Sequence, residues 1–231
     1  MKYCVVTALT FVLVSAAIEE RAMSATVSNG SFESGLNGWT FVDLTIPFQP
    51  LGVQSAGFIN NFGNVVIPSD GSSAVSHGFD GNGPGAISLS QDIGTVLAGE
   101  TLSFDYRAGW DIFGGTLDRT FLVQIEPGGA PLASYNIFTA VSGTNSYNGS
   151  NSDTGSLTAT IDLSSFAGSA IRTSFLWNIP ESFTGPGNFQ LDNVKIAAGS
   201  TAVPEPFTII GTLVGGTAAL RMRKKLKSTK V

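Results

Sequence analysis

Carboxylates are the residues of this chain whose number and placement could do chemistry. Between Ala25 and Val203 the sequence holds fourteen acidic residues, four basic residues, one histidine and no cysteine. Cysteine catalysis and histidine-rich zinc sites are therefore excluded. A serine triad would have to use His77, yet no G-x-S-x-G motif precedes a helix. A lone histidine of this kind is more often a strand-end residue than a base or a metal ligand.

The balance of charge also limits the partners. Four basic against fourteen acidic residues give this central part a charge of −10, which the basic C-terminus partly hides in the whole-chain value of −5. Proteins that bind nucleic acid present a basic face, so we expect no nucleic acid as a partner. An acidic, lysine-poor domain suits a secreted, soluble surface protein, and its carboxylates are ligands that calcium accepts.

Hydrolysis of glycosides is the reaction that carboxylates alone could support. It needs two of them about 5–9.5 Å apart, one with a raised pKa. Asp105 with Asp111 and Glu181 with Asp192 are conceivable pairs, but nothing in their spacing singles them out. No glycine-rich loop joins a strand to a helix, as phosphate chemistry would require. We therefore predict that the protein is not an enzyme, with a polysaccharide-active enzyme as the weaker alternative.

Aromatic residues beside carboxylates suggest a binding role instead. Trp110 follows Tyr106 and precedes Asp111 at a predicted strand end. An exposed aromatic ring there could stack on a sugar ring while the carboxylate accepts hydrogen bonds from hydroxyl groups. Trp110, Asp111 and Tyr106 are thus the predicted sugar-binding residues. The alternative is that Trp110 is a rim residue that covers the core, whereas Trp39 and Trp177 are expected inside it.

Strands with one apolar face must position these side chains. Apolar residues alternate with polar ones in several segments, which indicates antiparallel strands that share a core. No long amphipathic helix is predicted, although 162–166 could form one helical turn, and 141–156 and 47–72 read as long loops. The expected strands are 27–33, 39–46, 64–67, 73–79, 86–93, 101–106, 121–125, 133–140, 157–163, 171–179 and 189–196. This pattern predicts an all-β protein, an antiparallel β-sandwich.

The last strand breaks its alternation. Phe189 and Leu191 occupy odd positions, whereas Val194 and Ile196 occupy even ones, so the inward side changes near Asp192. A strand whose inward side changes needs a bulge or a sharp twist. A carboxylate at a bulge is well placed to leave the ladder and to bind something.

The same segments resemble a known fold family. The order of 29–33, 38–40, 89–93, 98–107, 162–164 and 189–194 resembles carbohydrate-binding jelly rolls of the galactose-binding-like fold. The resemblance implies a carbohydrate-binding body and a structural Ca²⁺ that joins Glu33 of the first strand to Asp192 of the last. Calcium takes six to eight oxygens, and carbonyl groups near 29–31 would supply the rest. The alternative is that both carboxylates are ordinary turn residues that cap backbone amides.

The N-terminus has the pattern of a secretory signal peptide. Lys2 precedes an apolar run over 5–17, and small residues at 22 and 24 flank Met23. We expect residues 1–24 to be the signal peptide, in a helix, with cleavage after Ser24; a transmembrane anchor is the alternative. The single cysteine, Cys4, lies within it, so the exported part has no disulfide.

The C-terminus has three parts in a fixed order. Pro204, Glu205 and Pro206 precede an uncharged run of 14 residues at 207–220, and six basic residues follow. A helix of that run spans roughly 21 Å, which is short for a hydrocarbon core of about 30 Å. A short crossing with snorkelling basic residues remains feasible, and the basic end would stay in the cytoplasm. A buried or amphipathic C-terminal helix is the alternative.

These residues resemble a PEP-CTERM sorting signal of the cyanobacterial type. The resemblance implies that an exosortase, a membrane-embedded protease, recognises Pro204, Glu205 and Pro206, removes the tail, and releases the body or attaches it to the cell surface. We therefore expect a signal peptide at 1–24, a β-sandwich at 25–199 and a sorting tail at 200–231. The expected protein is a non-catalytic surface or extracellular-matrix protein with exopolysaccharide as a candidate ligand. A structural or adhesive matrix protein without a sugar site is the alternative.

Overall fold

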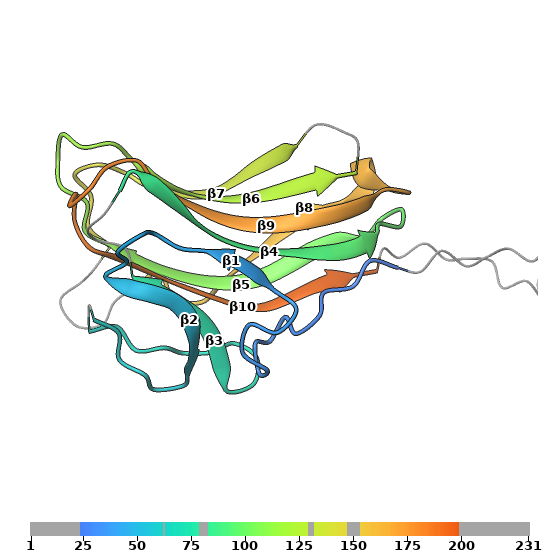
Figure 1. The fold of residues 1–231 in the computed structure, drawn as a ribbon, viewed down its shortest axis with the longest axis horizontal. Helices are drawn as coiled ribbons and strands as arrows, with labels where there is room; N and C mark the ends of the chain where they lie inside the picture. The colour runs from blue at the N-terminus through green and yellow to red at the C-terminus, as the bar shows by residue number, and fades with distance from the viewer. Residues whose placement is uncertain (1–23, 62, 79–82, 129–131, 147–152, 199–231) are drawn as a thin grey trace, which may run out of the picture.

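Two antiparallel β-sheets packed face to face make up the protein in a computed structural model that describes residues 24–61, 63–78, 83–128, 132–146 and 153–198 (Figure 1). The first sheet has the strand order β1-β4-β9-β6-β7, and the second has the order β2-β3-β10-β5-β8. Every strand pair in both sheets is antiparallel. The all-β sandwich predicted from the alternation is confirmed.

Each sheet takes strands from both halves of the chain. The first sheet consists of β1 (Thr40–Val42), β4 (Gly85–Thr95), β9 (Ala170–Ile179), β6 (Arg119–Pro127) and β7 (Ala133–Ala140). The second consists of β2 (Gln49–Ser55), β3 (Ser73–Gly78), β10 (Gly187–Ala197), β5 (Thr101–Trp110) and β8 (Leu157–Asp162). A 3₁₀ helix at Ser164–Phe166 is the short helical turn expected there.

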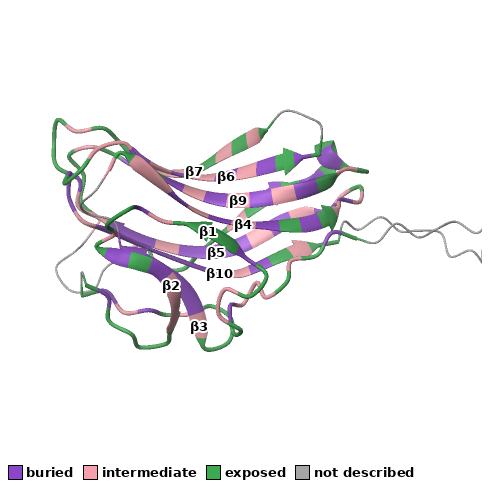
Figure 2. Ribbon diagram, viewed as in Figure 1, coloured by how far each residue is buried: buried purple, intermediate pink, exposed green. Residues whose placement is uncertain are grey.

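The core lies between the sheets, where aliphatic side chains surround a cluster of aromatic rings (Figure 2). Phe121 of β6, Phe175 of β9 and Phe189 of β10 are fully buried, and the ring of Phe121 lies 4.5 Å from that of Phe189. Trp39 and Trp177 are buried as predicted. Burial of alternate residues on facing strands is what the period of two requires.

Three expected strands differ in the structure. Segment 27–33 forms turns, because Asn29 and Phe32 have φ angles of 52° and 57° that no strand can hold. Segment 64–67 makes an isolated bridge from Val65 to Ile59 and no strand. The expected strand over 39–46 shortens to β1, and β2 lies in a segment predicted to be loop, since its Pro50 and Gly52 are unfavourable for strands.

The predicted change of side in the last strand is a β-bulge. The pairing of β10 with β5 shifts between Asp192 and Lys195, and Asn193 has a φ of 51°. After the bulge Val194 is again buried. Asp192 follows the inward Leu191 and precedes the bulge, so it lies on the outer face of the second sheet, under the segment that joins β2 to β3.

The sandwich has two different ends. The described chain begins, and β10 finishes, at the end on the right of Figure 1, whereas the β5–β6, β7–β8 and β9–β10 connections lie at the opposite end. The expected signal helix and C-terminal helix fall outside the described residues. Within the described part of the chain, no helix has the length and apolar character needed to cross a bilayer.

Candidate functional site

The predicted sugar-binding residues lie at the end of β5, but they do not form an open platform. Tyr106 points into the core and is 9 % exposed, and burial raises the pKa of its phenol. Trp110 is half-buried, and its ring stacks on Phe138 with centroids 5.5 Å apart. The indole Nε1 donates to Thr144 Oγ1 at 3.0 Å. This placement corresponds to the rim interpretation of Trp110, and the tryptophan orders the loop after β7.

Asp111 begins a group of loops at this end of the sandwich. Its amide donates to Pro186 O at 2.9 Å, and the amide of Phe113 donates to Thr184 O at 2.9 Å. The amide of Gly143 donates to Ile112 O at 2.9 Å. The connections at 111–118, 141–146 and 180–186 are therefore bonded to one another. They form a single surface, which we call the loop rim.

Large apolar side chains on the loop rim point into solvent. Phe183 is 68 % exposed and Phe113 is 54 % exposed. Leu117 lies in the same loop as Phe113, and Val141 lies in the loop that is bonded to it; both are also exposed. Folded proteins rarely expose several large apolar residues on one surface unless that surface binds something. Sequence reasoning missed these residues because they lie in loops, where alternation carries no information.

Contacts with Arg119 and with the backbone of Asp111 hold the Phe183 loop in place. Arg119 is 3 % exposed, and its Nη2 donates to Thr184 Oγ1 at 2.7 Å. Gly185 packs so closely that a Cβ there would lie 1.9 Å from Asp111 O. Phe183 itself has a φ of 53°, which is unfavourable for a bulky residue and persists only where the surroundings impose it. The exposed ring is thus presented on a fixed backbone.

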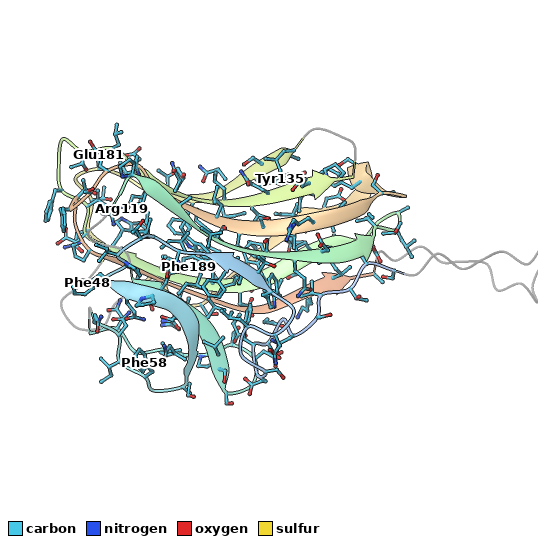
Figure 3. All side chains as sticks on the ribbon, in the orientation of Figure 1. Phe48, Phe58, Arg119, Tyr135, Glu181 and Phe189 are labelled. Carbon is cyan, nitrogen blue, oxygen red and sulfur yellow. The ribbon has the colours of Figure 1, made fainter. Side chains whose placement is uncertain are left out.

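Carboxylates are the charged groups of the loop rim. Asp111 and Asp118 lie in the first of its three segments and Glu181 lies in the last, and none of the three contains lysine or arginine. Asp118 Oδ1 accepts from the amide of Ser142 at 2.7 Å, and Glu181 accepts from the amide of Leu117. Figure 3 shows Glu181 at this end, above Arg119. Exposed aromatic rings next to hydrogen-bond acceptors and hydroxyl groups can recognise a ligand with apolar faces and many hydroxyls.

Glu33 and Asp192, the predicted calcium ligands, both contact the turn 69–73. Glu33 Oε1 accepts from the amides of Ser72 and Ser73 at 2.7 Å each, and Oε2 accepts from Ser72 Oγ at 2.7 Å. Asp192 Oδ2 accepts from the amides of Ser69 and Asp70 at 2.7 and 2.9 Å. The hydrogen bonds from Ser72 lower the pKa of Glu33, whereas burial raises the pKa of Asp192.

This donor set does not fit a calcium ion. Ca²⁺ requires six to eight oxygens directed at one point. Here N–H and O–H groups already point at both oxygens of Glu33 and of Asp192, whose Oδ1 accepts from the amide of Asn193 at 2.7 Å. No three side chains of Asp, Glu, His or Cys converge as a metal site anywhere in the described residues. The calcium site was expected from the resemblance alone, and these hydrogen bonds give it no support.

Asp105 and Asp111, one of the carboxylate pairs considered for hydrolysis, lie apart. Asp105 lies within β5, and Asp111 lies six residues further along the chain, roughly 20 Å away at the rise of a strand. Asp105 instead faces Asp192 across the β5–β10 pair. Burial opposes the ionisation of Asp105, but hydrogen bonds from Thr158 and Asn193 outweigh it and lower the pKa. All four carboxylate oxygens of Asp105 and Asp192 therefore accept hydrogen bonds from the protein, and the pair stabilises the fold.

Solved structures with a similar fold include sugar-binding modules and an adhesin domain. TmCBM61, solved in complex with β-1,4-galactotriose, shows 14% identity over 76% of this chain and 99% of its own, with a TM-score of 0.48. The non-crystalline cellulose specific module CBM28 shows 17% identity over 74% and 94%, with a TM-score of 0.49. The K3 adhesin domain of Lys-gingipain from Porphyromonas gingivalis shows 14% identity over 76% and 100%, with a TM-score of 0.47.

Structural similarity at such low sequence identity concerns only the arrangement of the strands, and it does not indicate a ligand for this chain. No protein-family model matches the sequence, and no curated protein matches it significantly. The sorting residues Pro204, Glu205 and Pro206 lie outside the described residues, so the sorting signal stays a prediction.

Proposed function

We propose that this protein is a non-catalytic, exported carbohydrate-binding protein whose β-sandwich holds a glycan at the loop rim. The observation that carries the proposal is the fixed presentation of Phe113 and Phe183, exposed beside Asp111, Asp118 and Glu181. Aromatic rings can pack against the C–H faces of sugar rings, and carboxylates accept hydrogen bonds from their hydroxyls. Export and sorting by an exosortase at Pro204–Pro206 belong to the same proposal and rest on the two terminal signals.

The ligand site is tested by a polysaccharide pull-down and a glycan array with the full chain. We expect Phe183→Ala and Phe113→Ala each to weaken binding about tenfold, or 1.4 kcal/mol, because a central aromatic contact is lost. Phe41→Ala is the matched control, since Phe41 is 48 % exposed on β1, away from the loop rim. Equal binding by all three variants, or no binding by the parent chain, would refute the proposal.

An adhesive role without a sugar site is the second candidate. Exposed apolar residues continue on the connections before β2 and before β3, where Phe48, Phe58 and Ile59 are at least one-third exposed. Figure 3 shows Phe48 and Phe58 toward the same end as Glu181. Several exposed large apolar residues at one end of a protein are typical of a surface that contacts other proteins. Self-association that Phe48→Ala and Phe183→Ala both abolish, together with failure of the glycan screen, would favour adhesion.

A further inference from the structure

The turn 69–73 is held between two carboxylates that lie far apart in sequence. Glu33 comes from the turns that precede β1, and Asp192 comes from the bulge in β10. The four amides of Ser69, Asp70, Ser72 and Ser73 all donate to them, at 2.7–2.9 Å. Hydrogen bonds between amides and ionised carboxylates are about twice as strong as those between neutral groups.

The backbone of this turn is shaped for the contact. Gly71 lies at its centre with a φ of 68°, a conformation that glycine adopts without strain. A Cβ at Gly71 would lie 2.6 Å from Glu33 Oε1. Its neighbours on both sides turn their amides toward the two carboxylates. A row of amides directed at an anion carries partial positive charge, as a cation would.

We propose that the amides of the turn 69–73 take the place of a divalent cation between Glu33 and Asp192, so that the sandwich joins its first segment to its last strand without calcium. We call Glu33, Asp192 and the turn 69–73 the clamp. A further residue of β10 holds the same β2–β3 connection. Gln190 accepts from the amide of Ile67 at 2.9 Å and donates to Val65 O at 3.1 Å. With Asp192, it fastens the connection over the outer face of the second sheet.

Thermal unfolding of the full chain, in millimolar CaCl₂ and in EDTA, tests the clamp. We expect the same Tm in both. Glu33→Gln and Asp192→Asn should each lower Tm by roughly 4–8 °C, equally in both buffers, because the backbone amides lose a charged acceptor and the NH₂ group that replaces one carboxylate oxygen cannot accept a hydrogen bond. Asp92→Asn is the matched control: it removes the same charge from an exposed carboxylate on the other sheet and should leave Tm unchanged.

A second variant disrupts the clamp while it leaves Glu33 and Asp192 unchanged. Gly71→Ala should displace the Glu33 carboxylate, and amide hydrogen exchange at 69–73 should accelerate at least tenfold with and without calcium. The proposal is overturned if calcium raises the Tm of the parent chain but not of Asp192→Asn, or if the amides of 69–73 are protected only when calcium is present.

Discussion

At the scale of single residues, His77 shows how burial changes chemistry. It lies on the inner side of β3 and is fully buried, with its ring 4.5 Å from Trp177 and 5.8 Å from Phe189. Burial lowers the pKa of its imidazole from 6.5 to about 3. The side chain is therefore neutral at physiological pH and is a core residue. The expected strand-end position is confirmed, since β3 ends at Gly78, but the small neighbours Ser76 and Gly78 gave no sign that His77 is buried.

This histidine makes the fold sensitive to acid. Below pH 6.5 the unfolded chain binds a proton at His77 that the folded chain does not bind until about pH 3. Stability is therefore lost as the pH falls through this window, by about 2 kcal/mol at pH 5. We expect His77→Leu to remove that part of the pH dependence in urea unfolding measured between pH 7 and pH 5. Parallel pH profiles for the two chains would contradict the assignment.

At the scale of elements, the turns before β1 are fastened to β10 of one sheet and to β4 of the other. Val194 donates its amide to Gly30 O at 2.9 Å, and Gln91 Nε2 donates to the carbonyls of Ser28 and Gly38 at 3.0 Å each. Asn29 Oδ1 accepts from the amide of Ser34 at 3.1 Å. These side-chain bonds replace the ladder that a strand at 27–33 would have made.

The close approach at Gly30 gives a test of this attachment. A Cβ at Gly30 would lie 1.8 Å from Val194 O. Gly30→Ala should therefore destabilise the protein by about 3 kcal/mol, at the upper end of overpacking effects, in chemical unfolding monitored by tryptophan fluorescence. Gly52→Ala is the control, because the nearest atom to a Cβ there is 3.9 Å away. A similar loss of stability in both variants would mean that Gly30 is not a tight contact.

At the scale of the whole molecule, the two ends of the sandwich have different roles in the proposal. The described chain begins and finishes at one end, and the loop rim lies at the other (Figure 1). A body attached through its C-terminus would therefore point the loop rim away from the point of attachment. The tail also carries six basic residues beyond Pro206, so its removal makes the product more anionic than the precursor.

The sorting prediction is tested on the protein in its host. Replacement of Pro204, Glu205 and Pro206 by alanine should leave the precursor at full length and at the membrane, because the recognised motif is lost. Immunoblotting of membrane, surface and medium fractions measures both size and location. A variant that keeps the basic tail but replaces Thr201 by alanine is the control. Unchanged processing in the triple variant would remove the basis of the sorting prediction.

The sequence alone determined the sandwich, most of its strands and the bulge near Asp192, because alternation of apolar residues reports directly which side of a strand is buried. Composition and the position of Cys4 also led us to expect no thiol chemistry in the exported part and no nucleic-acid partner. The tertiary structure decided where loops meet, which no local pattern encodes. It placed Tyr106 in the core, brought Phe113 and Phe183 onto one surface, and turned the amides of 69–73 toward Glu33 and Asp192. Each of these contacts joins segments distant in sequence, and only folding sets their geometry.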